Sequence, residues 1–140
     1  MNDYNLQRFI DAQKTGYQIA LSEIKNGKKQ SHWMWYIFPQ IQGLGFSSTS
    51  KYYAIKNIDE ATAYLNNSVL GKRLLEISNA LLQLATNDVH KIFGSPDDLK
   101  LRSSMTLFAS IDKTDPVFQN VLDKFFNGNK DDKTLQLIGE

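Results

Sequence analysis

The stretch that most constrains how this chain can fold is residues 28–40, which read Lys-Lys-Gln-Ser-His-Trp-Met-Trp-Tyr-Ile-Phe-Pro-Gln. It contains both tryptophans of the chain and one of its two histidines, and every side chain from Trp33 to Phe38 is large and apolar or aromatic. Such a run is buried in a folded protein, because exposing this much apolar surface to water is unfavourable. We therefore expect the core to form around it, with the polar groups at its two ends in or beside the core.

The run is too short and too uniformly apolar for its periodicity to distinguish a helix from a strand. Pro39 ends it in either case, because proline has no N–H to donate. Over most of the remaining chain, apolar residues recur three or four positions apart, which predicts helices. The expected helices cover residues 6–25, 47–53, 57–65, 68–85, 96–111, 116–126 and 133–138.

Several of these helices begin with a recognisable signal. Asn57 is expected to cap the helix that follows it, Ser68 the next one, and Asn2 or Asp3 the first. The strongest signal is Ser95-Pro96-Asp97-Asp98, in which serine caps, proline fits the first helical position and two carboxylates face the positive end of the helix dipole. The sequence thus predicts where most of the helices start.

Length and composition indicate one folded domain. A chain of 140 residues is the size of a single domain, 1–140, and 41% apolar residues is typical of a globular protein. Alternation of the kind seen in strands is confined to short pieces. The predicted class is therefore all-α, or α-dominated, with several helices packed into one compact domain.

Charge and residue usage exclude several classes of function. Sixteen Lys and Arg against fifteen Asp and Glu give a net charge of +1, so we expect neither nucleic acid nor a membrane as a partner. The absence of cysteine excludes disulfides, thiolate nucleophiles and cysteine metal sites. The histidines do not have metal-binding spacing and no dinucleotide fingerprint is present, so we expect no metal and no cofactor. The N-terminus does not resemble a signal peptide, and a cytoplasmic protein is expected.

His32 is the first candidate for chemistry. Its imidazole is suited to act as a general acid or base, or to donate a hydrogen bond to an anionic ligand. In the alternative interpretation it hydrogen-bonds to the backbone and holds the aromatic segment in place, which is the more common role. The sequence leaves both interpretations open.

A cluster of hydroxyl side chains is the second candidate. Ser103, Ser104 and Thr106 fall inside a predicted helix, although serine and threonine are indifferent helix formers there. Such a face serves either close helix packing with bonds back to the helix carbonyls, or contact with a polar ligand. Lys100, one turn earlier, belongs to the same face or only to the solvated surface.

An arginine and the two tryptophans could likewise serve either a ligand or the packing of the fold. Arg73 lies at the edge of an apolar stripe, where it would either clamp a phosphate or carboxylate or pair with Glu76. Trp33 and Trp35 offer flat faces on which a base, a nicotinamide or a sugar could stack, or they fill the core. Core packing must account for most of the aromatic side chains in this region.

The leading functional hypothesis is a pocket for a small polar or anionic ligand of the nucleotide or sugar-phosphate class. Its polar contacts are assigned to His32, Gln40, Arg73, Lys100, Ser103 and Ser104, and its wall to Trp33 and Trp35. One alternative is a hydrolase that uses His32 as acid or base, and another is a non-catalytic protein-interaction module with an exposed apolar patch. The identity of the ligand and the oligomeric state stay open.

Several motifs resemble those of a known bacterial family. They are Ser31-His32-Trp33-Met34-Trp35-Tyr36-Ile37-Phe38-Pro39-Gln40, Gly43-Leu44-Gly45, Ala61-x-x-Tyr64-Leu65, Val69-Leu70-Gly71-x-Arg73-Leu74 and Lys100-Leu101-Arg102-Ser103-Ser104-Met105-Thr106-Leu107-Phe108. On these motifs the chain resembles, from Leu6 to Leu137, the family called domain of unknown function 1810. The resemblance implies a compact, multi-helical single domain, and it implies no established activity, substrate or cofactor.

Two further comparisons concern function. Relatives of that family are sometimes labelled calpastatin, but calpastatin-type inhibitors are disordered and poor in apolar residues, whereas this chain is rich in aromatics and periodic helices. The tryptophan-rich early segment and the later helix with Arg102 and Met105 are also faintly similar to N-glycosidases that act on ADP-ribose-like compounds. That similarity gives the hydrolase alternative its substrate class.

Overall fold

The computed structural model describes residues 4–139, and within them it contains nine α-helices and one isolated β-bridge, between Ile41 and Ile55. The helices are α1 (Gln7–Lys25), α2 (Met34–Ile37), α3 (Ser48–Tyr52), α4 (Ile58–Asn66), α5 (Leu70–Leu82), α6 (Val89–Phe93), α7 (Asp97–Ala109), α8 (Val117–Phe126) and α9 (Asp132–Leu137). The prediction of an all-α fold is confirmed. No helix within residues 4–139 is both long and apolar enough to cross a membrane.

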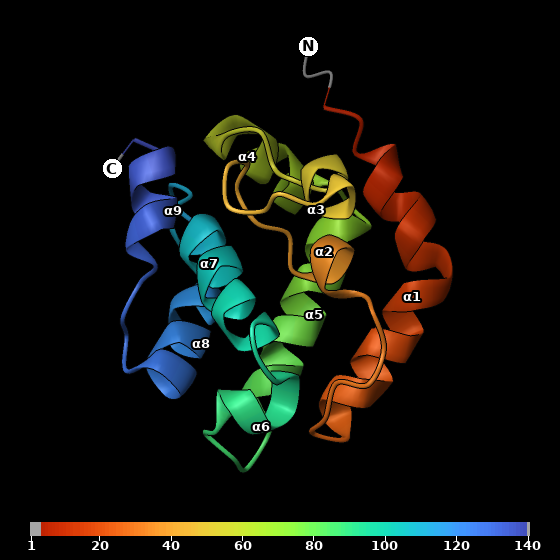
Figure 1. Cartoon of the computed structure of the whole chain (residues 1–140), viewed down its shortest axis with the longest axis vertical. Coiled ribbons are helices and arrows are strands. Elements are labelled where there is room, and N and C mark those ends of the chain that lie inside the picture. Colours follow the sequence, from red (N-terminus) through yellow and green to blue (C-terminus); the bar gives the residue numbers. More distant parts are fainter. Residues whose placement is uncertain (1–3, 140) are drawn as a thin grey trace.

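Helix α5 lies in the middle of the molecule (Figure 1). It packs against α1 on one side and against α8 on the other, and its N-terminal end meets α4. Helix α7 packs against α8 and also contacts α4, α6 and α9, while the short helix α2 rests on α1. This arrangement encloses one hydrophobic core that draws buried side chains from both ends of the chain.

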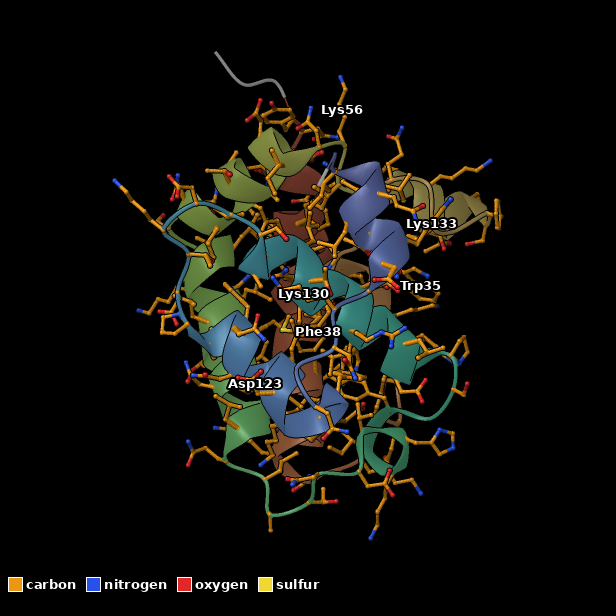
Figure 2. The ribbon with its side chains drawn as sticks, turned by 90° about the vertical axis from the view of Figure 1, so that its left-hand side faces the viewer. Trp35, Phe38, Lys56, Asp123, Lys130 and Lys133 are labelled. Atoms are coloured by element: carbon orange, nitrogen blue, oxygen red, sulfur yellow. The ribbon has the colours of Figure 1, made fainter. Side chains whose placement is uncertain are left out.

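The aromatic run forms a single helical turn, α2, which resolves the ambiguity that its periodicity left. Trp33, Met34, Ile37 and Phe38 are buried in the core, as expected. Trp35 is only half-buried. Figure 2 shows Phe38 in the interior between the ribbons and Trp35 toward the side of the molecule. The helical turn therefore divides the run into a core face and a partly exposed face.

Glu23 of α1 fixes the start of the aromatic run. Its carboxylate accepts hydrogen bonds from the backbone N–H groups of Gln30 and Ser31, from the Ser31 hydroxyl and from the Trp33 indole, at 2.5–2.9 Å. Burial alone would raise the pKa of Glu23, but the hydrogen bonds from Ser31, Gln30 and Trp33 outweigh it and lower the pKa to about 2. His32 lies between two of these anchored residues, and its side chain is exposed.

We expect Glu23→Gln to destabilise the protein by about 1–2 kcal/mol at pH 7, because the negative charge that accepts four hydrogen bonds is lost. The effect is not larger because solvent screens the charge of this partly exposed side chain. The pKa of Glu23 is lower in the folded than in the unfolded chain, so its contribution is complete above about pH 4.5 and disappears as the pH falls toward about 2. Urea unfolding from pH 7 to pH 2.5 should therefore show the two proteins converging in acid. An exposed control, Asp112→Asn, should differ little from wild type, and a constant gap for Glu23→Gln would contradict this account.

Two of the predicted helix caps are wrong. The Asn67 side chain, and not Ser68, accepts the N–H groups of Val69 and Leu70 at the start of α5. No side-chain hydrogen bond caps α7, so Ser95 does not have the predicted capping role, although the helix does begin at Asp97. The residue before the helix is Pro96, whose side chain has no hydrogen-bonding group.

Other starts were predicted correctly. Ser47, Asn57 and Asp115 each accept a backbone N–H at the start of a helix, through their side chains. Helix α6 was not predicted, because five residues are too few to show a period. The predicted caps Asn2 and Asp3 lie outside the described residues.

Candidate functional site

A pocket of about 510 Å³ opens beside α2 and α3. We call it the Trp35–Tyr53 pocket, after the two aromatic side chains in its wall. Its lining consists of Trp35, Gln40, Ile41, Gln42, Gly43, Gly45, Phe46, Ser50, Lys51, Tyr53 and Ala54. The volume lies within the range of roughly 300–1,000 Å³ that is usual for small-molecule sites.

The floor of the pocket is held by the β-bridge. The backbone N–H of Gln42 donates to the carbonyl of Ile55 at 2.7 Å, and the N–H of Ile55 donates to the carbonyl of Gln40 at 2.8 Å. Gln40 and Gln42 flank Ile41, the bridged residue, and a turn begins at Gln42. Both glutamines line the pocket, as does Ile41 between them.

The aromatic walls are held in place by their neighbours. The Tyr53 ring packs against Tyr52, Tyr36 and Phe9, with centroids 4.8, 5.6 and 5.8 Å away. Burial, followed by the nearby Tyr52 hydroxyl, raises the pKa of Tyr53, so its hydroxyl stays protonated and can donate a hydrogen bond at neutral pH. Phe46, by contrast, is 85% exposed at the rim.

Trp35 is held from the side of α7. The ammonium of Lys100 lies over the Trp35 ring, 5.4 Å from its centroid, which is cation–π geometry. Lys100 also pairs with Asp97 at 3.3 Å, and Asp97 pairs in turn with Lys29 at 2.9 Å. Lys100 and Lys29 thus share one carboxylate, that of Asp97.

Two glycines allow the pocket loop to pack closely. Gly43 has a φ of +108°, which side chains rarely adopt, and a Cβ there would also touch Leu137 of α9 at 3.2 Å. A Cβ on Gly45 would come within 2.4 Å of the Ser50 Cβ. The loop therefore rests on α9 at one point and on α3 at the next.

Arg8 of α1 holds the wall of the pocket that contains Tyr53. Its guanidinium donates to the backbone carbonyls of Tyr52 and Ala54 at 2.8 and 2.9 Å, and it pairs with Glu60 at 2.9 Å. The other oxygen of Glu60 accepts the N–H of Lys56 at 2.6 Å. Both side chains of the pair are almost fully buried, so the segment between α3 and α4 is tied firmly to α1.

Several polar groups of the pocket are not used by the fold. Within residues 4–139, no hydrogen bond involves the side-chain amides of Gln40 and Gln42, the Trp35 indole or the Tyr53 hydroxyl. None of the ion pairs in that part of the chain includes Lys51. The pocket therefore presents donors, acceptors and a positive charge that are available to a ligand. No three His, Asp or Glu side chains of the described residues lie close enough together to hold a metal ion.

The structure brings together three of the residues that the sequence singled out. Trp35 and Gln40 line the pocket, and Lys100 packs on Trp35 from outside the lining. Trp33, in contrast, is 1% exposed and belongs to the core, where its indole N–H donates to Glu23. His32 is exposed, and no hydrogen bond in residues 4–139 joins its imidazole to a carboxylate or hydroxyl. The acid–base hypothesis needed such a partner.

Arg73 lies in a different part of the molecule, between α1 and α5. Its guanidinium lies 5.2 Å from the centroid of the Tyr17 ring and donates a long hydrogen bond, 3.4 Å, to the Gln13 side chain. Glu76, its expected partner, instead accepts a short hydrogen bond from the Tyr17 hydroxyl. Arg73 thus takes part in a network that joins two helices.

The hydroxyl cluster on α7 also lies outside the pocket. Ser103 and Thr106 donate back to the carbonyls of Leu99 and Arg102, at 3.2 and 2.8 Å. Thr106 also accepts the N–H of Asp131, which ties α7 to the segment before α9. Ser104 is fully buried among helices and has no hydrogen-bond partner among the described residues. These contacts match the packing interpretation.

The polar residues on the far side of the pocket did not stand out in the sequence. Gln42 and Lys51 come from a segment that was expected to be only a loop and a short helix. One signal was available, because two glutamines at alternate positions share a face wherever the chain is extended. No local pattern indicated that this face would meet Trp35.

The comparisons with known proteins agree with this fold. The model of the protein family described as "Protein of unknown function (DUF1810)" matches residues 3–138. The chain belongs to the DUF1810 family. The crystal structure of the conserved hypothetical protein Rv1873 from Mycobacterium tuberculosis is similar to this DUF1810 chain, with a TM-score of 0.96 and 40% sequence identity over 99% of both chains. No curated protein matches the chain.

Family membership confirms the resemblance that the sequence motifs indicated. The DUF1810 description and the description of the mycobacterial protein name no activity. Function in this DUF1810 chain must therefore be argued from its own side chains.

Proposed function

We propose that this protein binds a small polar or anionic ligand in the Trp35–Tyr53 pocket. The observation that carries the proposal is the lining: two aromatic walls, two free glutamine amides and an unpaired lysine surround one pocket of about 510 Å³. Ligand sites are typically apolar clefts with a few convergent polar groups that fix orientation.

The support for the pocket lies in how rigidly its parts are held. Gln40 and Gln42 are fixed by the bridge to Ile55, Trp35 by Lys100, and the Tyr53 wall by Arg8. Holding the binding groups in position before the ligand arrives reduces the conformational entropy that binding would cost.

A ligand screen by thermal unfolding tests the proposal. Nucleotides, ADP-ribose derivatives and sugar phosphates are added to the protein, and a compound that binds the folded state at about 100 times its Kd should raise the Tm by about 5 °C or more. Trp35→Ala and Lys51→Ala should abolish most of that rise. Lys130→Ala, an exposed lysine outside the lining, is the matched control and should respond as wild type does. A rise that survives both pocket substitutions would place the binding site elsewhere.

A further inference from the structure

We infer that the ligand of the Trp35–Tyr53 pocket is a nucleoside monophosphate. Of the two ligand classes considered, nucleotides and sugar phosphates, this inference selects the nucleotides. The inference rests on the proposed function, since it names the ligand of the same site. Three features of the lining carry it: its aromatic walls, its pair of amides and its single cation.

The aromatic walls favour a flat heterocycle. Trp35, Tyr53 and the exposed Phe46 all line the pocket, and the Tyr53 ring is fixed by three other rings. Stacking of a nucleobase on an aromatic side chain contributes about 1–3 kcal/mol and does not depend on base identity. A sugar phosphate has no π-face, and would gain much less from walls of this kind.

The two amides suit the edge of a base. Each carboxamide carries an N–H₂ donor and a carbonyl acceptor, and a nucleobase edge presents donors and acceptors close together. Gln40 and Gln42 both line the pocket on either side of the bridged Ile41, and no hydrogen bond among the described residues uses their side-chain amides. Their backbone atoms are fixed by two hydrogen bonds to Ile55, so the amides project from a rigid base.

The charge of the lining suits one phosphate. Lys51 is the sole cation among the described lining residues, and no carboxylate accompanies it there. Lys100 lies on Trp35 outside the lining, and it shares the carboxylate of Asp97 with Lys29. One ammonium can pair with one phosphate, whereas di- and triphosphates are usually held by several cations or by a metal ion held by carboxylates.

The test is isothermal titration of the full chain with AMP, GMP, CMP and UMP, with the corresponding nucleosides, and with ribose 5-phosphate and inorganic phosphate. We expect at least one nucleotide to bind about tenfold or more tightly than its nucleoside, since a charge-assisted hydrogen bond contributes that much. Ribose 5-phosphate should bind at least about tenfold more weakly than that nucleotide, because it lacks the stacking base.

The variants separate the two halves of the ligand. Lys51→Ala should weaken the nucleotide about tenfold and leave the nucleoside within about twofold. Gln42→Ala should weaken nucleotide and nucleoside alike, by about tenfold, because it acts on the base. Lys130→Ala should change neither affinity.

The outcomes distinguish this inference from the proposed function. If ribose 5-phosphate binds as tightly as any nucleotide, the base is not recognised and the inference is wrong while the pocket stands. The same holds if no nucleotide binds but another compound of the thermal screen does, and depends on Trp35. If no compound binds at the pocket, both the inference and the proposed function are wrong.

Discussion

Replacing Arg8 with methionine is expected to lower the free energy of unfolding by about 3–5 kcal/mol. The guanidinium lies in an almost fully buried ion pair with Glu60, and removing it would leave the carboxylate buried without its partner. It would also remove the donors for the carbonyls of Tyr52 and Ala54. A buried charge without its partner is among the costliest defects in a folded protein.

Urea unfolding at neutral pH measures this effect, and α1 supplies its own control. Lys14 pairs with Asp11 on the same helix, but the two atoms are 4.0 Å apart and both side chains are mostly exposed. Lys14→Met should therefore cost less than about 0.5 kcal/mol. Combining Arg8→Met with Glu60→Gln should recover part of the loss, because the unpaired charge is removed. Equal losses for Arg8→Met and Lys14→Met would contradict the assigned role of Arg8.

The sequence predicted the helices well because most of them are long enough to show a period. Helix α1 begins and ends within a residue of its predicted bounds. Of the five leucine and isoleucine residues expected on the inner stripe of α5, Leu70, Leu74, Ile77 and Leu81 are buried, whereas Leu84 lies beyond the end of the helix and is only partly buried. The helix predicted over residues 96–111 extends past both ends of α7, which covers Asp97–Ala109. The apolar period continues in the sequence beyond the last helical hydrogen bonds. Local pattern therefore sufficed for the fold class.

The candidate site could be predicted only in part. Trp35 and Gln40 were found because the aromatic run is conspicuous in sequence, and the pocket indeed begins there. Its opposite wall depends on contacts between distant segments: Arg8 reaches the carbonyls of Tyr52 and Ala54, and Ile41 pairs with Ile55. No spacing rule encodes which distant segments will meet.

Several of the candidates that lie outside the pocket have their polar groups bonded within the fold. Hydroxyl groups such as that of Ser103 bond back to their own helix, and Arg73 lies against a tyrosine between two helices. Trp33 combines a buried ring with an indole N–H that reaches Glu23. Each of these polar groups is satisfied by the fold itself, whereas those of the pocket are not, and sequence alone does not distinguish the two cases.

Gly71→Ala is expected to lower the free energy of unfolding by about 3 kcal/mol, although alanine is normally the better helix former by about 1 kcal/mol. A Cβ at this position would lie 1.9 Å from the carbonyl oxygen of Leu65 and 2.8 Å from its carbonyl carbon. The obstacle is backbone, so it cannot rotate away. Helices α4 and α5 would have to separate at the junction where they meet.

A second glycine provides the comparison that decides the cause. A Cβ on Gly16 of α1 would come within 2.4 Å of the Tyr36 hydroxyl, which belongs to a side chain that can shift. Gly16→Ala should therefore cost only about 1 kcal/mol. Thermal and urea unfolding of both variants measure the difference. If Gly71→Ala is as stable as wild type, α4 and α5 can separate without lowering the free energy of unfolding, and this account is wrong. If Gly71→Ala is less stable than Gly16→Ala, the close backbone contact between α4 and α5 is the reason that this position of α5 requires glycine.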